Sequence, residues 1–118
     1  MKGGCHCGAI RFETKGKPMW VGACHCVDCK KISGSAYMAF VGHKIKDFKI
    51  PKGKPKVYKS SKNVQRSFCE KCGSPISYIS SHDKGMIFIP IGVFDNPKKF
   101  KIKKHIWTSQ KLPWVKTN

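Results

Sequence analysis

Seven cysteines, gathered into three short clusters, constrain the fold of this 118-residue chain more than any other feature. Residues 1–5 contain no apolar segment of the kind found in a secretory signal, so we expect a cytoplasmic protein whose thiols stay reduced. Cysteines at such short spacings in a reducing compartment bind metal ions more often than they form disulfides, which we keep as the weaker alternative. The clusters are Cys5-His6-Cys7, Cys24-His25-Cys26-Val27-Asp28-Cys29 and Cys69-Glu70-Lys71-Cys72.

The chain is short and strongly basic. Its length suits a single domain, residues 1–118, with a modest core. No apolar stretch approaches the roughly 20 residues of a membrane-spanning helix, so we expect no membrane partner. The net charge of +18 comes almost entirely from lysine, because Arg11 and Arg66 are the only arginines. This charge permits nucleic acid as a partner without favouring it, since the lysines are spread along the chain and no nucleic-acid-binding motif is present.

Short runs in which apolar and polar residues alternate predict a mainly β fold. Residues 9–13, which follow the first cysteine cluster, alternate in the way a half-buried strand does. Glycine and proline turns separate the runs, and the only helix that we expect is a single turn at 27–33. Further strands are predicted at residues 19–24, 36–41, 45–50, 57–59, 64–68, 76–79, 86–91 and 98–107.

The first and third clusters resemble two halves of one closed metal site. Each supplies two cysteines and is followed directly by a glycine, Gly8 or Gly73, which can adopt the left-handed conformation of a zinc-knuckle turn. The middle cluster then has three cysteines that could bind a second ion. A zinc ion with three protein ligands has a fourth coordination position open for water or substrate. The predicted structural ligands are Cys5, Cys7, Cys69 and Cys72, and the predicted catalytic ligands are Cys24, Cys26 and Cys29.

Other ligand sets remain open from spacing alone. The first cluster could complete a site with part of the middle cluster, which would leave the third cluster elsewhere. Four thiolates also suit an iron–sulfur cluster, and iron or copper is not excluded, although zinc suits sulfur-rich tetrahedral sites best. His6 and His25 each lie between two cysteines. In an extended segment such a residue points away from its neighbours, so we expect both histidines beside the sites or at the surface rather than as ligands.

The cysteine clusters occur together with several other short motifs. The whole set is Gly4-Cys5-His6-Cys7-Gly8, the middle cluster with Ser33-Gly34-Ser35 after it, Phe68-Cys69-Glu70-Lys71-Cys72-Gly73, His105-Ile106-Trp107 and Trp114. This set resembles the glutathione-dependent formaldehyde-activating enzyme family, to which centromere protein V also belongs. The resemblance implies a β-tent fold of small antiparallel sheets around two zinc ions, with the same division into four structural and three catalytic cysteines. It also implies a carbon–sulfur lyase activity, the condensation of glutathione with formaldehyde.

If the middle cluster holds zinc, the expected substrates are a small thiol such as glutathione and a small aldehyde. Zinc would lower the pKa of the thiol and act as a Lewis acid toward the aldehyde. Backbone amides or hydroxyls of Ser33, Gly34 and Ser35 are candidates for binding a carboxylate or oxyanion, and a plain turn is the alternative. Lys30 and Lys31 could recruit an anionic thiol, although a solvated lysine face is the better interpretation.

For three aromatic residues near the C-terminus we expect a role in packing rather than in binding substrate or moving a proton. Trp107 and Trp114 are expected to pack in the core or at a sheet edge, and His105 to be a strand histidine rather than a proton relay. Two rival functions remain: a zinc-stabilised basic module that binds nucleic acid or serves as a protein scaffold, and a family member whose open site has lost catalysis.

Overall fold

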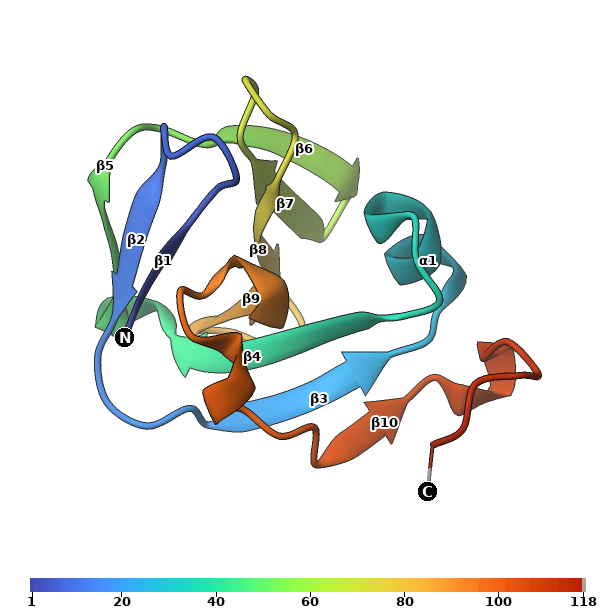
Figure 1. The fold of residues 1–118 in the computed structure, drawn as a ribbon. Coiled ribbons are helices and arrows are strands. Elements are labelled where there is room, and N and C mark those ends of the chain that lie inside the picture. Colours follow the sequence, from blue (N-terminus) through green and yellow to red (C-terminus); the bar gives the residue numbers. More distant parts are fainter. Residues whose placement is uncertain (118) are drawn as a thin grey trace.

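The computed structural model describes residues 1–117 and is mainly β, with two sheets and one short α-helix (Figure 1). Most strands follow the alternating runs of the sequence, because alternation lets one face of each strand enter the core. The strands are β1 (Lys2–Gly4), β2 (Arg11–Thr14), β3 (Trp20–Cys24), β4 (Met38–Lys44), β5 (Phe48–Lys52), β6 (Lys56–Ser61), β7 (Val64–Phe68), β8 (Pro75–Ser80), β9 (Met86–Pro90) and β10 (Lys104–Ile106). Four 3₁₀ turns occur at Ile45–Asp47, Ile91–Val93, Pro97–Lys99 and Thr108–Gln110.

The smaller sheet has the order β1-β2-β5 and is antiparallel. The larger sheet has the order β10-β3-β4-β9-β8-β7-β6. Its strands are also antiparallel, except that β10 runs parallel to β3 with His105 opposite Ala23. The fold class predicted from the sequence, a mainly β protein of small sheets, is therefore confirmed, with one parallel edge strand that the sequence did not reveal.

Helix α1 (Val27–Ser33) follows β3 at once and is limited by clear signals at both ends. The Cys26 sulfur accepts a hydrogen bond from the backbone N–H of Cys29 and so caps the N-terminus. Gly34 adopts a left-handed conformation with φ 64° and ends the helix, which is the usual role of glycine at a helix C-terminus. In Figure 1 the helix lies at one end of β3 and β4, so the middle cysteine cluster lies where β3 ends and the helix begins.

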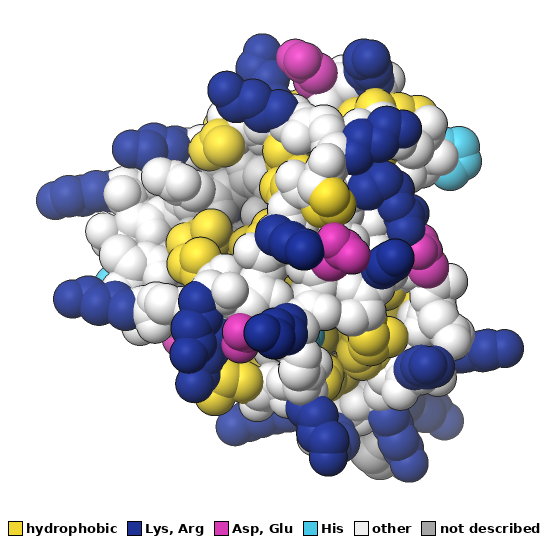
Figure 2. Space-filling model, turned by 90° about the vertical axis from the view of Figure 1, so that its left-hand side faces the viewer, with side chains coloured by type: hydrophobic (Ala, Val, Ile, Leu, Met, Phe, Trp, Pro, Cys, Tyr) yellow, Lys and Arg dark blue, Asp and Glu magenta, His cyan; other side chains and the backbone are white. Residues whose placement is uncertain are grey.

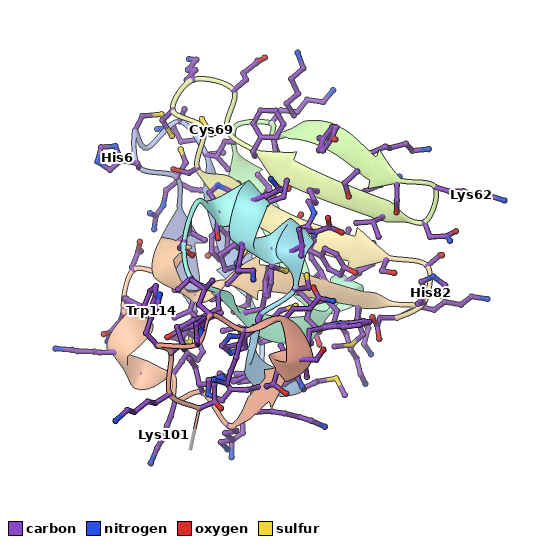
Figure 3. The ribbon with its side chains drawn as sticks, turned by 90° about the vertical axis from the view of Figure 1, so that its right-hand side faces the viewer. His6, Lys62, Cys69, His82, Lys101 and Trp114 are labelled. Carbon is purple, nitrogen blue, oxygen red and sulfur yellow. The ribbon has the colours of Figure 1, made fainter. Side chains whose placement is uncertain are left out.

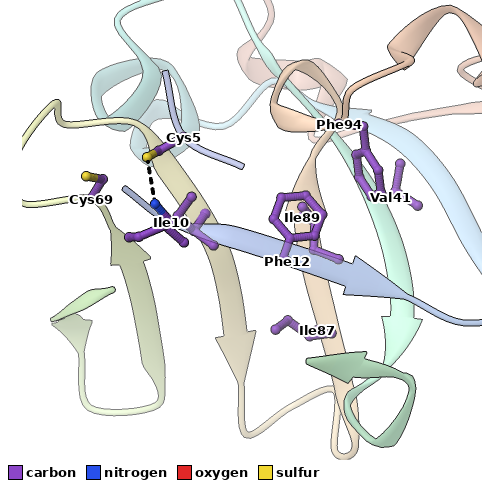
Figure 4. Packing of buried hydrophobic residues seen from close by; sticks show 9 residues of the cluster. Cys5, Ile10, Phe12, Val41, Cys69, Ile87, Ile89 and Phe94 are labelled. Atoms are coloured by element: carbon purple, nitrogen blue, oxygen red, sulfur yellow. Dashed lines mark hydrogen bonds between the residues drawn. The ribbon is translucent and has the colours of Figure 1, made fainter. Parts of the chain in front are cut away.

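The main core lies between the two sheets. Val41 on β4 and Ile87 and Ile89 on β9 face it, and Phe12 from the smaller sheet packs against Phe94 with their rings 5.1 Å apart (Figure 4). A second apolar cluster lies on the opposite face of the larger sheet, where the alternate residues of the same strands point. Its buried members are Cys24, Cys29, Met38 and Phe40.

Some of the expected strands differ from the structure. The alternation at 98–107 predicts one long strand, but only Lys104–Ile106 pairs with a neighbour, and a 3₁₀ turn at Pro97–Lys99 precedes it. The strand expected at 45–50 begins later, at Phe48, because Ile45–Asp47 forms a 3₁₀ turn. In both places alternation alone could not decide the structure, since a strand also needs a partner for its backbone groups. Within residues 1–117, none of the helices combines the length and the hydropathy that crossing a membrane requires.

Candidate metal centres and cleft

Two tight turns bring the first and third cysteine clusters together. In the first turn Gly8 donates its backbone N–H to the carbonyl of Cys5, and in the second Gly73 donates to the carbonyl of Cys69, at 3.1 and 2.7 Å. Both glycines have left-handed backbone conformations, with φ 82° and 80°, as the sequence predicts for knuckle turns. The two turns also contact each other, because the backbone N–H of His6 donates to the Ser74 hydroxyl.

The sulfurs of Cys5, Cys7, Cys69 and Cys72 all lie within 4.8 Å of one another. The Cys5–Cys7 and Cys7–Cys69 sulfur distances are 3.6 and 3.8 Å. Sulfurs about 2.3 Å from a tetrahedral zinc ion would be separated by about 3.8 Å, so the donor set and its spacing fit zinc. Hydrogen bonds from Ser74 lower the pKa of Cys72 to about 5, which favours the thiolate that a metal needs as its ligand.

The second group consists of Cys24, Cys26 and Cys29, whose sulfurs also lie within 4.8 Å of one another. Cys24 is the last residue of β3, Cys26 caps helix α1 and Cys29 lies within its first turn, so one strand end and one helix start hold all three. A hydrogen bond with the Cys29 thiol lowers the pKa of Cys24 to about 6, and the same contact raises the pKa of Cys29. Three soft sulfurs at this spacing also fit a metal ion.

All seven cysteines are free thiols, and the structure gathers them into one group of four and one group of three. Neither group contains a histidine. His6 is exposed and projects outward from the loop beside Cys69 (Figure 3). His25 is fully buried, and its Nε2 lies 2.9 Å from Nδ1 of His105 on β10. Burial and the nearby His105 lower the pKa of His25. The His25–His105 contact holds β10 against the segment that carries the three cysteines.

The three-sulfur group opens onto a cleft of about 810 Å³. The cleft lies over the second face of the larger sheet, and its floor is a row of residues that pair across neighbouring strands. Tyr78 packs against Phe88 with ring centroids 5.9 Å apart, and Phe88 packs against Trp20 at 5.7 Å. The row is completed by Arg66 at one end and by Gly42 between Phe88 and Trp20.

The residues expected to bind substrate after the middle cluster lie elsewhere. Ser33, Gly34 and Ser35 form the C-terminal cap of α1, where the Ser33 hydroxyl donates to the Cys29 carbonyl at 2.7 Å. None of the three lines the cleft. The Lys30 ammonium donates to the carbonyl of Gln110 and so joins the helix to the C-terminal segment. The structure therefore gives this stretch a capping and packing role.

The two C-terminal tryptophans are not in the core, which is one of the two positions expected from the sequence; Trp107 directly follows the edge strand β10. Trp107 is 59 % exposed and Trp114 is 71 % exposed. Trp107 lines the cleft and is the only non-glycine residue with a positive φ, 56°, among those described. Trp114 projects from the C-terminal segment (Figure 3). Burial in the core fails because a tryptophan in a short polar tail has too few apolar neighbours to bury it.

Much of the rest of the cleft is formed by residues that no sequence motif marks. Trp20, Arg66, Tyr78 and Phe88 come from four different strands, and none of these four residues is part of a chemical motif. Alternation places each of them on one face of its own strand, but only the register between strands brings them into one row.

The fold and the site define a class of protein. It is a small β protein with two candidate metal sites formed by cysteines, one of which lies beside a cleft. The chain belongs to the glutathione-dependent formaldehyde-activating enzyme family, whose model matches residues 1–110.

The chain is also similar to a known protein and to a solved structure. A Schizosaccharomyces pombe protein described as an uncharacterized lyase is 28 % identical over 93 residues, which cover 79 % of this chain and 67 % of the relative. A crystal structure of a Rhodobacter sphaeroides protein is similar with a TM-score of 0.72 at 19 % identity, over 86 % of this chain and 97 % of that one. The second similarity shows the fold alone.

Proposed function

We propose that this protein is a zinc-dependent enzyme of the carbon–sulfur lyase type, which adds a small thiol such as glutathione to formaldehyde or another small aldehyde. Cys24, Cys26 and Cys29 hold the catalytic zinc in this proposal. Cys5, Cys7, Cys69 and Cys72 hold a structural zinc. The family name supports the substrates, and the lyase name of the Schizosaccharomyces pombe relative supports the reaction type.

The difference between the two cysteine groups is the observation that carries the proposal. One group offers four sulfurs, enough to complete a tetrahedral zinc site with protein ligands alone. The other group offers three and lies in the wall of a cleft of about 810 Å³, within the size range of small-molecule sites. A structural site gains nothing from a cleft, whereas a reaction site needs one.

The side chains of the cleft have separate roles in this proposal. A zinc ion bound by the three cysteines supplies Lewis acidity and lowers the pKa of a thiol that reaches it. Trp20, Tyr78 and Phe88 form an apolar floor that limits the access of water to the sulfurs. The exposed Trp107 lies at the cleft with a backbone conformation that most residues avoid, and we assign it to the wall that contacts the substrate.

The direct test is to add ¹³C-labelled formaldehyde and glutathione to zinc-loaded protein whose metal content has been measured. NMR then monitors the rate at which the thiol–aldehyde adduct forms. We expect two zinc ions per chain and faster adduct formation than in the buffer alone. Cys26→Ser should retain one zinc and lose the rate enhancement. If the wild-type protein with two zinc ions gives no enhancement with glutathione or with other small thiols and aldehydes, the enzyme proposal is wrong.

The basic charge supports a second candidate, a binding module for nucleic acid. Figure 2 shows Lys and Arg side chains projecting around the whole outline of one face rather than gathering in one patch. Such a distribution favours weak, non-specific attraction. Binding of a DNA duplex that persists at 200 mM salt, together with no thiol chemistry, would favour this candidate over the enzyme.

A further inference from the structure

Arg66 occupies an unusual position for a charged side chain. It comes from β7, it lines the cleft onto which the three-sulfur group opens, and only 8 % of its surface is exposed. Its guanidinium lies 4.9 Å from the centre of the Tyr78 ring, which is its cross-strand neighbour. The aromatic ring therefore fixes the orientation of the guanidinium within the cleft wall.

This guanidinium forms no ion pair with an acidic side chain among the residues described, although its charge contributes to the lowered pKa of the Cys24 thiol in the same cleft. Neither of its neighbouring acids on the cleft, Asp28 and Asp83, forms an ion pair with it, and both are exposed. Its Nε is buried without a hydrogen-bond acceptor. Arg11, the other arginine, is more exposed and pairs with Asp95 through both of its terminal nitrogens. A buried permanent charge with an unused donor is costly unless an anion joins it.

A second, smaller cavity of about 330 Å³ lies beside the cleft and shares Arg66, Phe40 and Tyr78 with it. Arg66 is the only charged residue in the lining of this cavity. The rest of the lining is uncharged, and the hydroxyls of Ser67 and Ser77 bond to each other at 2.6 Å. Arg66 is therefore the single charge that acts within this smaller cavity.

We propose that Arg66 is the carboxylate-binding residue of the cleft and selects thiols that carry a carboxylate. The planar guanidinium suits a two-point contact with a carboxylate, which a lysine cannot reproduce. Its place in the same cleft as Cys24, Cys26 and Cys29 lets one molecule present its carboxylate to Arg66 and its sulfur to the cysteine group. The thiol part of this inference rests on the proposed function, and the carboxylate part does not.

Because the chain has only two arginines, the response of the Arg66 side chain to a carboxylate can be observed directly by NMR. Arginine-selective ¹⁵Nε NMR of the zinc-loaded protein gives one signal for Arg66 and one for Arg11. The probes are S-methylglutathione, which has two carboxylates and no free thiol, and its diethyl ester. We expect the free acid to shift the Arg66 signal and leave the Arg11 signal in place, and the ester to shift neither. An Arg66 signal that stays unchanged up to millimolar acid, or that responds equally to the ester, would overturn the proposal.

Substitutions give a second measurement. Arg66→Met should weaken the binding of S-methylglutathione at least about tenfold, which is the usual effect of losing a charged hydrogen bond. Arg66→Lys should restore only part of the affinity, and Arg11→Met should bind as the wild type does although it loses the same charge. If Arg66→Met weakens the acid and the ester equally, Arg66 is a packing residue and the proposal is wrong.

The two proposals can fail separately. If the acid shifts Arg66 but no thiol adds to formaldehyde, the carboxylate site stands and the enzyme proposal fails. If adduct formation is normal in Arg66→Met at low thiol concentration, the enzyme proposal stands and the role of Arg66 is refuted.

Discussion

Gly73 shows how much a single residue contributes to the four-sulfur group. It follows Cys72 directly, has φ 80°, and has open space where a Cβ would be added. Its N–H closes the turn onto the Cys69 carbonyl at 2.7 Å. The only obstacle to another residue is therefore the backbone conformation, which an L side chain adopts at a cost of about 1–2 kcal/mol.

We expect Gly73→Ala to lower both the stability of the fold and the retention of one metal ion. The strain distorts the turn that aims Cys69 and Cys72 at their partners, so metal should be lost to a chelator earlier than in the wild type. The matched control is Gly85→Ala, because Gly85 also has a positive φ, 76°, and open space but lies in the β8–β9 hairpin. Equal metal retention in the two variants, measured by a competing chelator dye, would show that the turn does not govern the site.

Strand β3 is the element that connects the chemistry to the core. It lies between β10 and β4 in the larger sheet, supplies Trp20 to the cleft floor and ends at Cys24. The Trp20 ring lies across Gly22, where an added Cβ would meet a ring atom at 2.5 Å and the Lys104 carbonyl of β10 at 2.8 Å. The absence of a side chain at Gly22 is thus required by both the cleft and the sheet edge.

Gly22→Ala is expected to destabilise the protein by about 1–3 kcal/mol, the usual range for overpacking. The backbone carbonyl of β10 cannot move away without breaking the parallel pairing, so β10 should separate from β3. Gly42→Ala is the comparison, since its Cβ would meet only side-chain atoms, at 3.0 Å from Phe88 and 3.3 Å from Trp20. Urea unfolding should give the larger loss for Gly22→Ala; the reverse order would mean that β10 contributes little to the sheet.

For the whole molecule, a metal ion bound by the four-sulfur group would cross-link distant parts of the chain. Cys7 and Cys69 are 62 positions apart, and they join the loop that precedes β2 of the smaller sheet to the loop after β7 of the larger one. A structural zinc site contributes on the order of 10 kcal/mol in small domains. That is comparable with the entire stability of a domain this size, about 5–15 kcal/mol.

Cys72→Ser should therefore unfold the protein, whereas Cys26→Ser should leave it folded with one metal ion fewer. Serine is a good N-cap, so the second substitution removes a soft ligand and preserves the cap of α1. Circular dichroism melts with metal counts on both variants provide the check. If the two variants melt together and lose the same metal content, the division into a structural and a catalytic site is wrong.

The sequence by itself determined the mainly β character, the two knuckle turns and the family, because each depends on local spacing or on alternation within one strand. Spacing left other groupings of the cysteines open, and the structure brings Cys5 and Cys7 beside Cys69 and Cys72. Only the tertiary structure decided which side chains line the cleft. In the structure, Ser33, Gly34 and Ser35 form a helix cap, and Trp107 and Trp114 are exposed. Arg66 lines the cleft. The physical reason is register: a shift of one residue sends every side chain of a strand to the other face. The irregular pairing between Ser67 and Phe68 on β7 is one place where no local pattern reveals that register.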